Sequence, residues 1–96
     1  MLIKAGVYID RLDPKIRKKL GKIEDLYAER NEVLIITSTY EGTHSAGSLH
    51  YANMAIDTRW PIKRRDTIID ELKKTLGPDY DVVPEGDHIH IEYDPK

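Results

Sequence analysis

The chain has 96 residues, of which 40% are hydrophobic and 33% are charged, a composition typical of one globular domain, 1–96, with a modest core. Its 15 basic and 17 acidic residues give a net charge of −2, which provides no electrostatic reason to expect a nucleic-acid partner. The chain has no cysteine, so any metal site must be built from histidine and carboxylate side chains.

The first half of the chain predicts a helix between two extended segments. Residues 3–9 are apolar and compatible with a short strand or an extended lead-in. Asp13 and Pro14 are typical of a helix N-cap followed by proline at the first helical position. Apolar residues then recur at steps of three and four, at Ile16, Leu20, Ile23, Leu26 and Tyr27. Residues 32–38 are a continuous apolar, β-branched run, which predicts a central strand buried on both faces.

The second half predicts a further strand, a second helix and a β-hairpin. Residues 54–58 are typical of a short strand, and a helix is expected to open at Pro61 and end at Gly77. The residues expected on its inward face are Ile62, Ile68, Ile69, Leu72 and Leu76. Residues 81–83 and 89–93 indicate two strands joined by a tight turn. The predicted fold class is therefore α+β, with a small, mainly antiparallel sheet packed with two helices.

Three of the four histidines fall in two short groups, each beside an acidic residue. His50 precedes Asp57 by seven positions at the end of a short apolar run, and His88 and His90 would point to the same face of an extended strand. Zinc in catalytic sites takes three nitrogen or oxygen ligands from the protein and keeps one position for water. His50, Asp57 and one of the two late histidines therefore predict a zinc site.

Attack of a zinc-activated water on an amide also requires a base for the water's proton and a donor for the oxyanion. Glu85 lies three residues before His88, and Asp87 lies three residues before His90. Either carboxylate is a candidate for the base, and the spacing leaves the choice open. The loop after residue 38 is long for so small a chain and rich in Gly, Ser and Thr, which favours a functional loop.

The stretch from His50 to Asp57, with Ala55 two residues before the aspartate, resembles the His-x-x-Gly-x-Ala-x-Asp motif of the M15-type zinc peptidases. These include D-alanyl-D-alanine carboxypeptidases and phage L-alanyl-D-glutamate endolysins. Residues 48–51 and 88–90 are also similar to hedgehog signalling domains, which share this zinc-peptidase-like fold. The resemblance extends from about residue 33 to the C-terminus.

The zinc ligands that the resemblance implies are His50, Asp57 and His90. It places Asp87 at the catalytic carboxylate of the endolysins and Glu85 near the glutamate of hedgehog domains. His88 would be a second polar group that lines the site, where it would hold an oxyanion or another side chain.

The sequence departs from the peptidase pattern in three places. Asn53 replaces the usual glycine, which is a mild change because asparagine tolerates a left-handed backbone. Many M15 peptidases carry Ser-x-Tyr-Arg after the central strand, whereas here Glu41 follows Tyr40. Arg59 or His44 is the expected replacement for that arginine, and Tyr40 is a further candidate for substrate contact. The acidic cluster of the hedgehog calcium site is mostly missing.

The resemblance implies a zinc-dependent peptidase, either a carboxypeptidase or an endopeptidase, that hydrolyses amide bonds of peptidoglycan stem peptides. The alternative is a non-catalytic, hedgehog-like zinc-binding interaction module. We expect a monomer whose partner is a peptidoglycan-derived peptide, without nucleic acid or membrane. No apolar run suits a signal peptide or a membrane span, so we expect a protein that is cytoplasmic as synthesised and released to the cell wall if phage-encoded.

Overall fold

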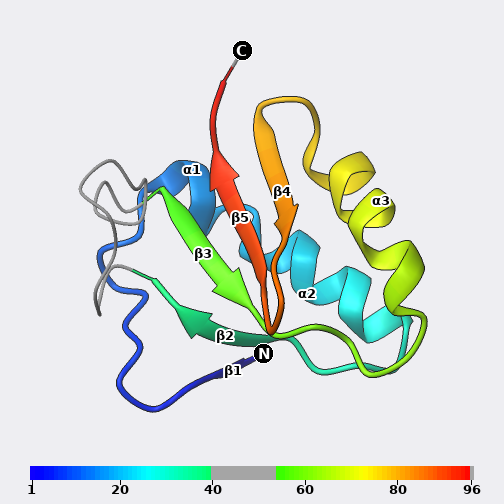
Figure 1. The fold of residues 1–96 in the computed structure, drawn as a ribbon. Helices are drawn as coiled ribbons and strands as arrows, with labels where there is room; N and C mark the ends of the chain where they lie inside the picture. Colours follow the sequence, from blue (N-terminus) through cyan, green and yellow to red (C-terminus); the bar gives the residue numbers. More distant parts are fainter. Residues whose placement is uncertain (40–53, 96) are drawn as a thin grey trace.

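The computed structural model describes residues 1–39 and 54–95 and confirms the α+β class (Figure 1). The strands are β1 (Leu2–Ile3), β2 (Ile35–Ser38), β3 (Ala55–Thr58), β4 (Tyr80–Pro84) and β5 (Ile89–Tyr93). The helices are α1 (Pro14–Arg17), α2 (Leu20–Glu29) and α3 (Arg65–Leu76). The strands form one sheet in the order β1-β2-β3-β5-β4, in which β1 and β2 are parallel and all other neighbours are antiparallel.

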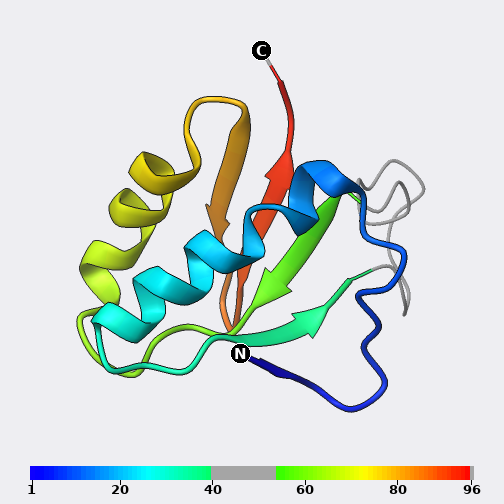
Figure 2. The same cartoon turned by 180° about the vertical axis from the view of Figure 1, so that it is seen from behind.

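Helices α1 and α2 lie behind the sheet in Figure 1 and in front of it in Figure 2, so both cover the same face. The core forms between these helices, α3 and the sheet residues that point toward them, among which Ile56, Ile89 and Ile91 are fully buried. Because side chains alternate along a strand, the residues between these isoleucines point to the opposite face. That face carries the polar residues of β3 and β5. Within residues 1–39 and 54–95, every helix is too short or too polar to traverse a bilayer.

The first predicted helix begins where expected but is divided in two. The carboxylate of Asp13 accepts a hydrogen bond from the Lys15 backbone N–H at 2.8 Å, and Pro14 is the first helical residue. The N–H of Lys19 then bonds to the carbonyl of Ile16, three residues back, which tightens the chain between α1 and α2. The apolar stripe continues through the break, and its buried members are Ile16, Leu20, Ile23 and Tyr27.

The prediction that residues 32–38 form a strand buried on both faces is wrong. The strand begins only at Ile35, and burial alternates around it: Leu34 and Ile36 lie in the core, whereas Val33 is 57% exposed. The reason is that the helices cover only one face of the sheet at this position. The unbroken apolar run therefore does not correspond to two covered faces.

Helix α3 begins four residues after the predicted start at Pro61. Arg64 stands before it with φ 51°, a left-handed conformation, and the buried Arg30 guanidinium bonds to the Arg64 carbonyl and, at 2.9 Å, to Thr67 Oγ1. The expectation that Ile62 points inward is therefore wrong, since it lies outside the helix and is 85% exposed. The other inward residues that are buried are Ile68, Leu72 and Leu76. Gly77 ends the helix with φ 90°, as predicted.

Substitution of one buried and one exposed isoleucine tests the packing of α3 through the free energy of unfolding. Ile68→Ala is expected to lower the free energy of unfolding by about 2–5 kcal/mol, because the side chain is fully buried against the sheet. Ile62→Ala, the matched control, is expected to change it by less than about 0.5 kcal/mol. Denaturant unfolding of both variants measures the difference. Equal losses would contradict the packing of α3 described above.

Candidate metal and catalytic site

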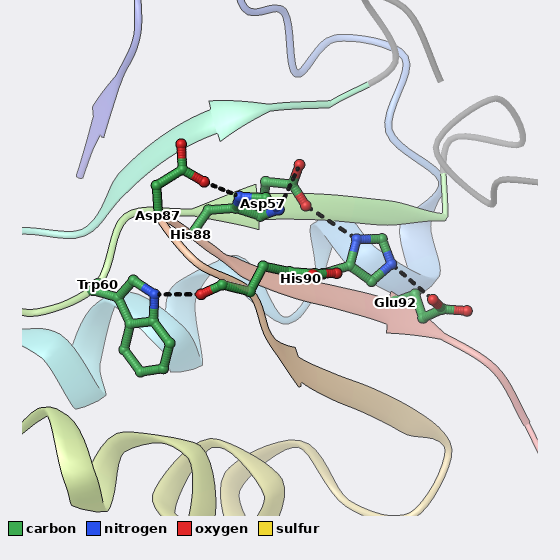
Figure 3. Close-up of polar contacts among 7 residues, drawn as sticks. Asp57, Trp60, Asp87, His88, His90 and Glu92 are labelled. Carbon is green, nitrogen blue, oxygen red and sulfur yellow. Dashed lines mark hydrogen bonds and ion pairs between the residues drawn. The ribbon is translucent and has the colours of Figure 1, made fainter. Parts of the chain in front are cut away.

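The centre of the polar face is a pair of side chains from neighbouring strands. Asp57 on β3 stands directly opposite His90 on β5 in the antiparallel register. Its Oδ1 atom lies 3.0 Å from His90 Nδ1, and Figure 3 shows the two side chains pointing toward one another. Asp57 is only 8% exposed, so its carboxylate depends on such partners for the hydrogen bonds that water would otherwise supply. The structure thus brings two of the predicted zinc ligands into contact.

Glu92 is hydrogen-bonded to the other ring nitrogen of His90. It lies two residues after His90 on β5, on the same face, and its Oε1 is 2.7 Å from His90 Nε2. The hydrogen bond with Asp57, above all, and the one with Glu92 raise the pKa of His90 above its usual value, although burial acts against this. Sequence reasoning gave Glu92 no role, and the period of two along a strand is the signal that could have identified it.

His88 adds a second histidine to the same group. Its Nε2 lies 3.7 Å from Asp57 Oδ2, so His88 and His90 both reach Asp57 from the same face of the chain, as their spacing predicts. Its Nδ1 lies 2.7 Å from Asp87 Oδ1. That hydrogen bond with His88 is the main reason that the pKa of Asp87 is lowered. Carboxylates and imidazoles therefore alternate across the strands (Figure 3).

The turn between β4 and β5 is held in place by Trp60. The indole Nε1–H donates to the backbone carbonyl of Glu85 at 3.0 Å, and the Glu85 N–H donates to the carbonyl of His88 at 2.9 Å. The guanidinium of Arg65 lies 4.9 Å from the centre of the indole ring, on its face. The turn that carries Asp87 is thus fixed to the segment that follows β3.

A polar cavity of about 420 Å³ opens beside these residues. It is lined by Lys4, Thr37, Ser38, Asp57, Arg59, Asp87 and His88. Arg59 was predicted for this site, whereas Lys4 was not, since no spacing motif connects the N-terminus to the late histidines. Glu85 is exposed and is not among the lining residues, so of the two candidate bases the structure places only Asp87 at the cavity.

A larger cavity, of about 580 Å³, lies between the end of α3 and β4. Its lining includes Lys73, Lys74 and Val82 but no histidine, so it lacks the metal-binding chemistry of the smaller cavity. His50, His44 and Tyr40 lie outside the described residues. Of the three predicted ligands, two, Asp57 and His90, therefore lie among the described residues.

Asp57 and His90 are joined by a hydrogen bond whose length is close to the separation of two zinc ligands. Two ligands of a tetrahedral zinc, each bonded at 2.0–2.1 Å, stand about 3.3 Å apart, close to the 3.0 Å between Asp57 Oδ1 and His90 Nδ1. Asp57 and Glu92, the carboxylates on the two sides of the His90 ring, favour positive charge there and raise the pKa of His90. Glu92 on the remote ring nitrogen matches the carboxylate that commonly orients a metal-binding histidine.

A group of three carboxylates, Asp81, Glu92 and Asp94, lies at the β4–β5 end of the same face with oxygen atoms within 4.8 Å of one another. It is the only group of three potential ligands so close together within residues 1–39 and 54–95. Glu92 is hydrogen-bonded to His90, however, and an all-carboxylate set suits harder cations than zinc. This group therefore does not replace the predicted zinc site.

No protein-family model matches the chain, and no curated protein matches it in sequence.

The pKa of His90 predicts how stability depends on pH in the zinc-free protein. A pKa raised by folding means that protonated His90 stabilises the fold, fully below the unfolded value of about 6.5 and progressively less as pH rises through the folded pKa. The free energy of unfolding, measured in chelator, should therefore fall over this range. The fall should be smaller in His90→Gln, and identical curves for the two proteins would contradict the paired geometry.

Proposed function

We propose that this chain is a zinc-dependent peptidase that hydrolyses amide bonds of peptidoglycan stem peptides. The observation that supports the proposal is the contact between Asp57 and His90. It lies beside a polar cavity that is lined by Asp57, Asp87 and His88. His50, Asp57 and His90 form the proposed ligand set. The choice of peptidoglycan as the substrate is supported by the resemblance to the M15-type peptidases.

The residues around the cavity supply the functions that amide hydrolysis needs. Zinc bound by this ligand set would activate a water molecule and polarise the substrate carbonyl. Glu92 fixes the ring of His90 with Nδ1 toward Asp57, which keeps the liganding nitrogen in position. His88 lines the cavity and offers a polar donor for the oxyanion that forms when the carbonyl is attacked, and Arg59 lines the same cavity as a candidate for substrate contact.

We assign the role of proton acceptor to Asp87. Its carboxylate lies at the cavity, and its lowered pKa keeps it ionised across the neutral range, ready to accept a proton, although with reduced basicity. The hydrogen bond to His88 Nδ1 fixes its orientation. The exposed Glu85 side chain has neither the cavity position nor this partner.

A non-catalytic zinc-binding module is the second candidate. It is favoured by the solvation of Asp87, whose side chain is 95% exposed, because a base that works in a peptidase is usually more shielded from water. Glu41, at the place where many M15 peptidases carry arginine, also favours it. Both proposed functions use the same zinc site, but only the peptidase would cleave a peptide.

Zinc affinity tests the ligand set. Glu92→Ala is expected to weaken zinc binding by about 10- to 100-fold, because the orienting carboxylate on His90 is lost. Glu29→Ala, on the exposed surface of α2, is the control and should bind zinc as the unmodified chain does. Competition titration with a chromogenic chelator measures both. If the unmodified chain binds no zinc at micromolar zinc concentrations, the proposed zinc site is wrong.

Catalysis tests the assignment of the base. Asp87→Asn should retain zinc but cleave muropeptides about 10²- to 10⁴-fold more slowly, because the proton acceptor is lost. Glu85→Gln, which makes the same chemical change two residues earlier, should retain most activity. Chromatography of digested muropeptides and metal analysis of each protein provide the readouts. Tight zinc binding without cleavage of any wall peptide by the unmodified chain would establish the binding module instead.

A further inference from the structure

Two cations at the cavity have no part in zinc binding or in proton transfer as assigned above. Lys4 follows β1, and Arg59 follows the last residue of β3. Both residues line the cavity that Asp57, Asp87 and His88 also line. Within residues 1–39 and 54–95, neither cationic group makes a hydrogen bond or an ion pair with another side chain. Asp57 and Asp87 also line the cavity, but two cations without a side-chain partner among the described residues can offer charge-assisted hydrogen bonds to an anionic ligand group.

The N-terminal segment is held at this place by its backbone. The N–H of Lys4 donates to the carbonyl of Ile36 at 2.9 Å, which extends the parallel pairing of β1 with β2 by one residue. The chain then leaves the sheet through Gly6, whose φ of 86° few other residues adopt readily. The Lys4 backbone is therefore anchored at the β1 side of the cavity that this residue lines.

The order of the strands separates charges across the cavity. Lys4 belongs to the β1 side, whereas His88 and Asp87 belong to the β5 side, with β2 and β3 between them. The spacing from β1 to β3 is about 9–10 Å, and an extended peptide advances about 3.3–3.6 Å per residue. Once the reach of the lysine side chain is subtracted, one or two substrate residues fit between the scissile carbonyl at Asp57 and an anion held by Lys4.

We propose that Lys4 and Arg59 bind the free α-carboxylate at the C-terminus of the substrate, so that the site removes terminal residues and does not cut within a peptide. The anion lies one or two residues from the reacting bond, which is where the terminal carboxylate of a carboxypeptidase substrate lies. An endopeptidase substrate has an uncharged amide at that position and gains nothing from the two cations. This inference rests on the proposed peptidase function.

The test compares one wall pentapeptide that ends in D-alanyl-D-alanine as the free acid with the same peptide as its C-terminal amide. Binding is measured by NMR titration of the full chain in chelator, where no turnover interferes. The free acid should bind about tenfold more tightly than the amide, as expected for charge-assisted hydrogen bonds. Lys4→Met, which removes the charge from an exposed side chain and keeps the backbone bond to Ile36, should abolish most of this preference and leave amide binding unchanged.

Lys18→Met is the matched control, because Lys18 is an exposed lysine at the end of α1, on the helical side of the sheet, and it should retain the preference. Digestion by the zinc-loaded chain is measured in parallel, and release of the terminal residue from the free acid alone is expected. Cleavage of acid and amide at equal rates, or equal affinities for the two peptides, would overturn the carboxylate site while the peptidase stands. A preference for the acid that depends on Lys4, in a chain that cleaves neither peptide, would overturn the peptidase and retain the carboxylate site.

Discussion

The pairing register between β3 and β5 is the constraint on which both the core and the site depend. Four consecutive residues of β3 face four of β5, and Asp57 is opposite His90. A slip of one residue would turn His90 toward the helices and Ile89 or Ile91 toward solvent, because side chains alternate along a strand. Each buried isoleucine contributes about 1.5–3 kcal/mol, so the core opposes such a slip strongly. The hydrophobic residues that stabilise the sheet therefore also position the polar pair on its other face.

The polar face is organised as an alternation of carboxylate and imidazole. Asp57 contacts both late histidines, and each histidine has a second carboxylate on its other nitrogen, Asp87 for His88 and Glu92 for His90. A poorly hydrated carboxylate requires such partners, and an imidazole between two carboxylates favours positive charge. This arrangement can hold a proton or a divalent cation at the same place. In the proposed zinc site, metal binding would therefore compete with protonation of His90.

Local patterns predicted most of the elements correctly. The Asp13-Pro14 cap, the stripe of α2, the end of α3 at Gly77 and the β4–β5 hairpin are all determined by neighbouring residues, whose spacing is visible in the sequence. The errors have a common cause, which is that burial depends on distant elements. The chain could not show that only one face at Ile36 would be covered, or that the helix after Pro61 would begin at Arg65.

The sequence by itself determined that His88 and His90 share a face and that acidic residues accompany them, because a strand repeats every two residues. Only the tertiary structure decided that β3 lies beside β5, which brings Asp57 to His90, and that the N-terminal Lys4 reaches the same cavity through β1 and β2. It also placed Asp87 at that cavity and left Glu85 outside. The physical reason is that periodicity is a local property of the backbone, whereas the order of strands in a sheet results from the packing of the whole core.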